Sequence, residues 1–61
     1  MTKQEFDDKI EQLEGELDEA RDLLRQAEED GNKRMINQAQ NEISRIVRKM
    51  SNLKSNWNLE Q

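Results

Sequence analysis

The sequence predicts an all-α protein, an antiparallel two-helix hairpin of the coiled-coil type that dimerises into a four-helix bundle. Two runs of apolar residues, spaced alternately by three and four, flank one turn signal at Asp30-Gly31-Asn32. Each apolar residue before the turn has a counterpart equally far beyond it, from Ala27 and Ile36 out to Phe6 and Trp57. The two halves also carry opposite net charge. These observations favour a single helical-hairpin domain over residues 1–61.

The first helix is expected over about residues 3–29. It begins with Thr2-Lys3-Gln4-Glu5, which has the form of a capping box: the Thr2 hydroxyl accepts from the Glu5 amide while the Glu5 side chain reaches back to the amide of Thr2. Gly15 falls at an outward position and is interpreted as a tolerated surface residue, at a cost of about 1 kcal/mol relative to Ala. The heptad run of this helix comprises Phe6, Ile10, Leu13, Leu17, Ala20, Leu24 and Ala27.

The second helix is expected over about residues 33–57, after a turn at 30–32. Gly31 suits the left-handed residue that ends a helix, and Asn32 suits the cap that starts the next. Asn and Ser are frequent on the outward positions, so tertiary packing must hold this helix together. Residues 58–61 are expected to fray. The heptad run comprises Ile36, Ala39, Ile43, Ile46, Met50, Leu53 and Trp57.

Charge supports the same pairing of the two helices. Residues 1–31 hold twelve acids and four bases, a net of -8, whereas residues 32–61 hold two acids and six bases, a net of +4. The antiparallel register places three pairs of opposite charges near one another: Asp7 near Lys54, Glu28 near Lys33, and Glu16 near Lys49. Each exposed pair is worth only a few tenths of a kcal/mol. We therefore expect these pairs to select orientation and register more than to add stability.

A lone hairpin leaves much of its apolar stripe open, and three further residues widen that stripe. Leu23 and Met35 lie at heptad position g and Val47 at e, so they join the heptad residues in the predicted core or dimer interface. Small alanines near the turn face larger partners, which lets layers interdigitate. The simplest completion is a twofold homodimer of hairpins. The alternative is a two-helix coiled coil that docks on a different protein.

Composition excludes several function classes. The chain has no Cys and no His, so it lacks thiol nucleophiles, the commonest acid–base group and the commonest transition-metal ligands. It has no Gly-rich phosphate loop, and the turn lacks the spaced oxygen ligands of a calcium loop. We predict no enzyme activity, no catalytic, cofactor or metal site, and no small-molecule substrate. No apolar run approaches the ~18 residues of a membrane span, so a soluble, cytoplasmic protein without membrane contact is expected.

One family resembles this chain in its opening residues, Met1-Thr2-Lys3-Gln4-Glu5, in its length and in a tight helix–helix turn at Asp30. This is the repressor-of-primer (Rop) family of plasmids, and the resemblance implies a helical hairpin that dimerises into a four-helix bundle and binds paired RNA hairpin loops. That family binds RNA through a line of Lys, Asn, Phe, Gln and Lys on its first helix. Lys3 matches the first and Arg25 is similar to the last. The three middle places are occupied by Ile10, Glu14 and Asp18.

A second segment, Asn41-Glu42-Ile43-Ser44-Arg45-Ile46, is similar to a motif of small sporulation-phosphatase hairpins of bacilli. That motif has Asp where this chain has Ser44. Because the carboxylate is missing, the phosphatase activity is not carried over.

The charged outer faces suggest how the protein acts. We expect a regulator or modulator that binds another protein, such as a DNA-binding regulator, through an acidic stripe on the first helix, as some small phage and bacterial modulators do. A stripe that serves only solubility is the plain alternative. The residues of the stripe are Asp8, Glu11, Asp18, Glu19, Asp22 and Glu29.

Two other interpretations stay open. The second helix carries residue types that contact phosphates and base edges, namely Arg34, Asn41, Arg45, Arg48, Lys49 and Asn52. The acidic helix about 10 Å away opposes nucleic-acid binding, and the bases then serve only to complement it. The symmetrical register is also compatible with a scaffold engineered for its fold alone.

Overall fold

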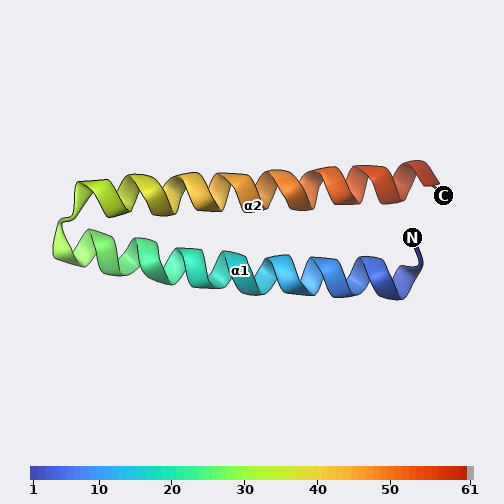
Figure 1. Ribbon diagram of the computed structural model, residues 1–61, viewed down its shortest axis with the longest axis horizontal. Helices are drawn as coiled ribbons and strands as arrows, with labels where there is room; N and C mark the ends of the chain where they lie inside the picture. The colour runs from blue at the N-terminus through green and yellow to red at the C-terminus, as the bar shows by residue number, and fades with distance from the viewer. Residues whose placement is uncertain (61) are drawn as a thin grey trace.

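The structure, a computed structural model that describes residues 1–60, is a hairpin of two antiparallel helices (Figure 1). Helix α1 spans Lys3–Asp30 and helix α2 spans Lys33–Glu60. The turn between them lies at one end of the molecule, and the two chain termini lie together at the other. This confirms the predicted all-α hairpin.

Helix α1 begins at a side-chain cap. Thr2 has extended backbone angles, and its hydroxyl oxygen accepts a hydrogen bond of 3.2 Å from the Glu5 amide, as predicted. The Glu5 carboxylate does not complete the capping box in the predicted way. It accepts a 3.3 Å hydrogen bond from the Thr2 hydroxyl, so the two side chains bond to each other. Glu5 is exposed, so no neighbouring side chain prevents it from adopting this conformation.

The turn is closed by backbone and side-chain hydrogen bonds that belong to both helices. Gly31 adopts the left-handed conformation with φ 67° and ψ 24°, and its amide donates to the Glu28 carbonyl at 3.2 Å. The Asn32 amide donates to the Ala27 carbonyl at 3.0 Å, which satisfies another free carbonyl of α1. The Asn32 side-chain oxygen then accepts from the Met35 amide at 3.2 Å and caps α2. One three-residue segment thus ends one helix and starts the next.

The register of the two helices is visible at the end opposite to the turn. The rings of Phe6 and Trp57 stack with their centroids 4.9 Å apart and their planes at 14°. Phe6 and Trp57 are the same number of residues away from the Gly31–Asn32 peptide bond. Because both helices rise by the same length per residue, residues at equal distances from the turn lie opposite one another. The predicted layers therefore stay in phase along the whole hairpin.

Burial follows the heptad pattern. Four heptad residues are buried, namely Ala20, Ala27, Ala39 and Ile46. The other heptad residues are half-buried: Phe6, Ile10, Leu13, Leu17, Leu24, Ile36, Ile43, Met50, Leu53 and Trp57. The interhelix face is thus the one predicted from spacing, although most of its side chains keep part of their surface open.

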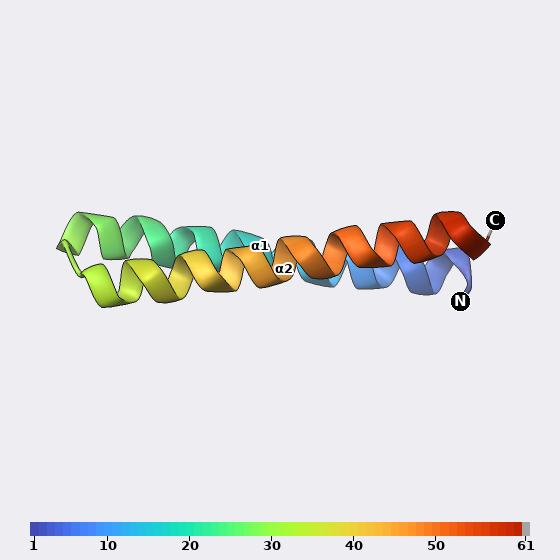
Figure 2. The same ribbon diagram turned by 90° about the horizontal axis from the view of Figure 1, so that it is seen from above.

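The hairpin is a single layer of helix. Its Cα extents are 45 × 16 × 9 Å. Seen from above, α1 and α2 cross at a shallow angle and wind around each other (Figure 2). A layer this thin cannot enclose large side chains, which explains why the heptad residues are mostly half-buried. No helix in the described part of the chain is both long and apolar enough to cross a membrane.

The structure differs in detail from two expectations, on the end of the second helix and on the charges between the helices. Helix α2 continues to Glu60, beyond the predicted end at residue 57, and Gln61 lies outside the described residues. Nothing after Asn32 breaks the helix, since the second half has neither Pro nor Gly. None of the three expected charge pairs forms an ion pair within residues 1–60, although Glu16 and Lys49 line the same recess. Exposed Lys and acid side chains lose rotamer entropy when they pair, and the gain is small.

The two glycines provide a matched test of the turn. A Cβ at Gly15 or at Gly31 would meet no atom within 4 Å. The two positions therefore differ only in backbone conformation, which is left-handed at Gly31. Gly15→Ala should stabilise the protein by about 1 kcal/mol because Ala favours the helix interior. Gly31→Ala should destabilise it by about 1 kcal/mol because a side chain disfavours the left-handed region. Urea unfolding measures both, and a neutral Gly31→Ala would contradict the turn.

A second pair of variants tests the register. Ile46→Ala, at a site 3% exposed, should lower the free energy of unfolding by about 2–5 kcal/mol. Leu17→Ala, in the same layer, should fall in that range too. Val47→Ala is the control, because Val47 is 49% exposed. Thermal melting followed by circular dichroism compares the three. A loss no larger for Ile46→Ala than for Val47→Ala would show that the helices pair in another register.

Candidate interaction surfaces

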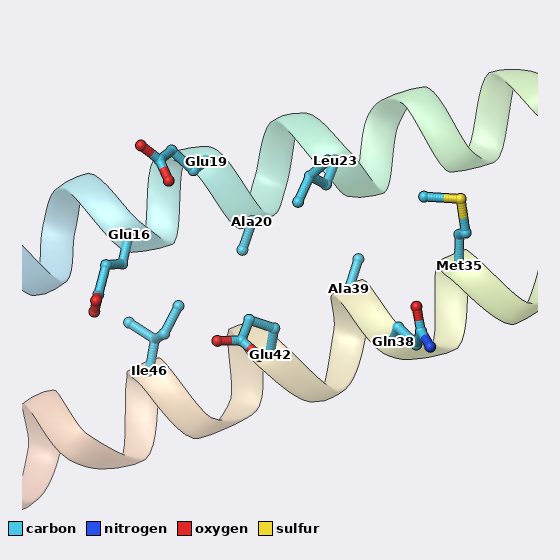
Figure 3. A pocket seen from close by; sticks show the side chains of 9 residues that line it. All are labelled: Glu16, Glu19, Ala20, Leu23, Met35, Gln38, Ala39, Glu42 and Ile46. Atoms are coloured by element: carbon cyan, nitrogen blue, oxygen red, sulfur yellow. The ribbon is translucent and has the colours of Figure 1, made fainter.

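The acidic face runs along the outside of α1. It consists of the six predicted carboxylates, all of which are exposed: Asp8, Glu11, Asp18, Glu19, Asp22 and Glu29. They occupy outward heptad positions, and Glu19 lies on the side of α1 that faces away from α2 (Figure 3). From Asp8 to Glu29 the face is roughly 30 Å long at 1.5 Å per residue. An unbroken helix holds it straight.

The carboxylates of the acidic face have no ion-pair partner within residues 1–60. Arg25 lies on the same outward side but pairs with none of them in the described part of the chain. All six groups are therefore available to an external cation. Because they sit on one side of one helix, their fields add over the length of the face.

The basic face lies on the outer side of α2. Its six predicted residues are also exposed: Arg34, Asn41, Arg45, Arg48, Lys49 and Asn52. None of its bases pairs with an acid of α1 among the residues described. Lys49 lines a shallow recess together with Glu16 of α1. The two charged faces thus lie on opposite outer sides of the hairpin.

Three large apolar side chains predicted for the core or dimer interface are exposed in the single chain. Leu23 is 50% exposed, Met35 44% and Val47 49%. Leu23 and Met35 come from different helices and lie on the same side of the hairpin, which we call the Leu23–Met35 flank. Val47, at heptad position e, lies on the opposite side, the Val47 flank. Within one hairpin nothing covers either flank.

The Leu23–Met35 flank contains a hollow of about 390 Å³ (Figure 3). Its floor is made by Ala20, Ala39 and Ile46, whose side chains point into the space between the helices. Leu23 of α1 and Met35 of α2 also line it. A second recess on this flank, lined by Leu13 and Leu53 nearer the termini, has a volume of about 310 Å³. Sequence reasoning missed the hollow, although the alanines near the turn were its signal.

The ionisable side chains of the described residues lie at the surface. Every Asp, Glu, Lys and Arg within residues 1–59 is exposed. Among the described residues, no group of three or more Asp or Glu side chains is arranged to hold a metal ion. Ser44, where the sporulation-phosphatase motif has Asp, is exposed beside Val47 and Arg48.

Comparison with protein-family models, curated proteins and solved structures finds no match for this chain. The resemblance to the Rop family therefore extends only to the hairpin plan. Of the places that correspond to that family's RNA-binding line, Lys3, Glu14, Asp18 and Arg25 are exposed, whereas Ile10 is half-buried between the helices. At these places this chain thus exposes two acids and two bases, whereas the Rop family has two bases and three neutral side chains.

Proposed function

We propose that this chain is a non-enzymatic regulator that acts by contact: a homodimer of hairpins that binds a basic surface of a partner protein through the acidic face. The observation that carries the proposal is that the carboxylates of the acidic face are exposed and unpaired within the described residues. Six exposed carboxylates lie along one rigid helix, and within residues 1–60 none of them is paired.

The acidic face is suited to a partner that normally binds nucleic acid. Duplex DNA presents one negative charge per ~1.7 Å of its axis, in a rigid and regular array. The acidic face is also a straight array of negative charge, and it is already ordered before binding. A preordered surface pays less conformational entropy on association than a flexible acidic tail would. A DNA-binding regulator is therefore the class of partner that fits best.

The half-buried heptad residues support the dimer. A chain of 61 residues has a marginal core even when its apolar side chains are fully enclosed. Here only four of them are buried. A second hairpin on one flank would bury more of this surface and give a four-helix bundle.

Nucleic-acid binding by the basic face, similar in kind to the RNA binding of the Rop family, is the second candidate. The unpaired bases of α2 within the described chain favour it, because α1 does not neutralise them by contact. Against it stands the net charge of -8 on residues 1–31, about 10 Å away and within one screening length. Repulsion of phosphates by that charge is the reason a protein partner is preferred.

Charge reversal on two sides of α1 tests the proposal. The first variant carries Asp18→Lys, Glu19→Lys and Asp22→Lys on the acidic face. The matched control carries Asp7→Lys, Glu14→Lys and Glu28→Lys, which make the same charge change on exposed positions of the Val47 flank. Both are used to capture proteins from a bacterial lysate, with the wild type alongside. The first should lose basic partners at least tenfold, because close like charges oppose binding, and the control should retain them.

An unchanged set of partners in the first variant would contradict the role of the acidic face. A gel-shift assay at low salt with duplex DNA and with RNA hairpin loops separates the second candidate. A shift that disappears when Arg45 and Arg48 are changed to Glu would favour nucleic acid over a protein partner.

A further inference from the structure

The two flanks of the hairpin differ in the charge of the residues that line their recesses. The hollow on the Leu23–Met35 flank is lined by three acids, Glu16, Glu19 and Glu42, and by no base among the residues described. On the Val47 flank, one recess is lined by Arg48 and another by Lys54, and neither is lined by an acid within the described chain. The hollow is therefore the recess that favours a positively charged occupant.

The hollow combines this charge with an apolar interior. Its floor is formed by Ala20, Ala39 and Ile46, all of them buried (Figure 3). Leu23 and Met35, which also line it, are exposed. An exposed apolar surface that is rimmed by polar side chains is typical of an interaction site. An occupant that fits is apolar on the side that enters the hollow and positively charged where it passes the rim.

From these observations we infer that the hollow binds an amphipathic helix of the partner protein, with apolar side chains against Leu23 and Met35 and with Lys or Arg side chains against the acidic rim. The inference rests on the proposed binding of a basic partner and names the part of that partner that is bound. The residues of α2 that line the hollow run from Met35 to Ile46, roughly 16 Å or about three helical turns. A helix that inserts apolar residues at i, i+3, i+4 and i+7 covers a groove of this length.

The hollow is continuous with the acidic face, because Glu19 belongs to both. A helix bound in the hollow therefore has the rest of its partner's basic surface beside the carboxylates of α1. Toward the termini the acidic character ends, since the neighbouring recess is lined by Lys9 and Lys49 together with Glu16. The bound helix is thus expected on the half of the flank that lies nearer to the turn.

A basic helix fits the hollow better than a second copy of this chain does. In a twofold contact centred on the hollow, the same surface lies on both sides, so the three carboxylates of one copy face those of the other. Like charges brought close together oppose binding. This leaves the Val47 flank for the second hairpin of the proposed homodimer.

A synthetic helix tests the hollow. The probe is a fluorescein-labelled peptide of about 18 residues made of Leu, Lys and Ala, with Leu at helical spacing on one face and Lys on both sides of that face. Fluorescence anisotropy at low salt gives its dissociation constant for the full chain. A scrambled peptide of the same composition has the same charge but no apolar face. It should bind about tenfold more weakly or worse, because it loses the apolar contact with the hollow.

A first pair of variants tests the apolar part of the hollow. Leu23→Gln with Met35→Gln should weaken binding of the amphipathic peptide about tenfold or more, because both changes remove apolar contacts at the centre of the interface. The control is Val47→Gln, at a similarly exposed position of the other flank, and should leave the dissociation constant unchanged. Circular dichroism shows that each variant stays helical.

A second pair tests the rim and leaves every residue of the acidic face intact. Glu16→Gln with Glu42→Gln should weaken binding of the same peptide about tenfold or more, because the Lys side chains lose their counter-charges. The matched control is Glu14→Gln with Glu28→Gln, which removes the same charge from exposed positions of the Val47 flank. That control should change the constant little.

Binding of the amphipathic peptide no tighter than that of the scrambled peptide would overturn the inference. Equal weakening by the variants and their controls would overturn it too, because net charge alone would then explain binding. Neither result touches the proposed function, which the charge reversal of Asp18, Glu19 and Asp22 decides separately. Sedimentation equilibrium covers the remaining occupant: a loss of self-association in Leu23→Gln with Met35→Gln would show that a second copy fills the hollow, and would overturn the inference as well.

Discussion

The register between the two helices is the constraint on which the rest of this structure depends. It is held at one end by the turn, where Gly31 and Asn32 satisfy the free carbonyls of α1 and cap α2. It is held at the other end by the stacked rings of Phe6 and Trp57. With both ends held, helices of equal rise have no freedom to slip, because a shift by one residue would move every heptad side chain off the shared face.

The same register decides what the surface presents. Once the heptad residues face inward, the carboxylates of α1 and the bases of α2 must point to opposite outer sides. The apolar side chains left over must lie on the two flanks, and Leu23 and Met35 line a hollow near the turn. The positions of the charged and apolar side chains on the surface are therefore a consequence of how the two helices pair. A single layer with such flanks leaves Leu23, Met35 and Val47 exposed.

Much of this fold could be predicted from the sequence because its signals are local and repeated. The apolar spacing, the glycine at the turn and the Thr2 cap each depend on a few neighbouring residues. The predictions that differ from the structure depend on weaker signals. The three ion pairs between helices depend on long exposed side chains, for which water competes almost equally. The end of α2 depends on the absence of a breaker, which is a weaker signal than the presence of one.

The surfaces were harder to predict than the core for a physical reason. The acidic face could be listed from heptad positions, because direction follows from the helical period. The hollow between Ala20, Ala39 and Ile46 depends on how far each side chain reaches, which spacing does not give. Charge alone also fits both a binding surface and a soluble one, so the partner cannot be derived from composition.

Proton–proton contacts in solution test the register most directly. In a nuclear Overhauser spectrum of the wild-type protein, the aromatic protons of Phe6 should give strong cross-peaks to the indole protons of Trp57, whose ring centroid lies 4.9 Å away. The same indole should give no strong cross-peak to Leu13, one heptad along α1. Strong contacts from Trp57 to Leu13, with none to Phe6, would show a register shifted by a heptad. That result would contradict the pairing on which the core, the two charged faces and the flanks depend.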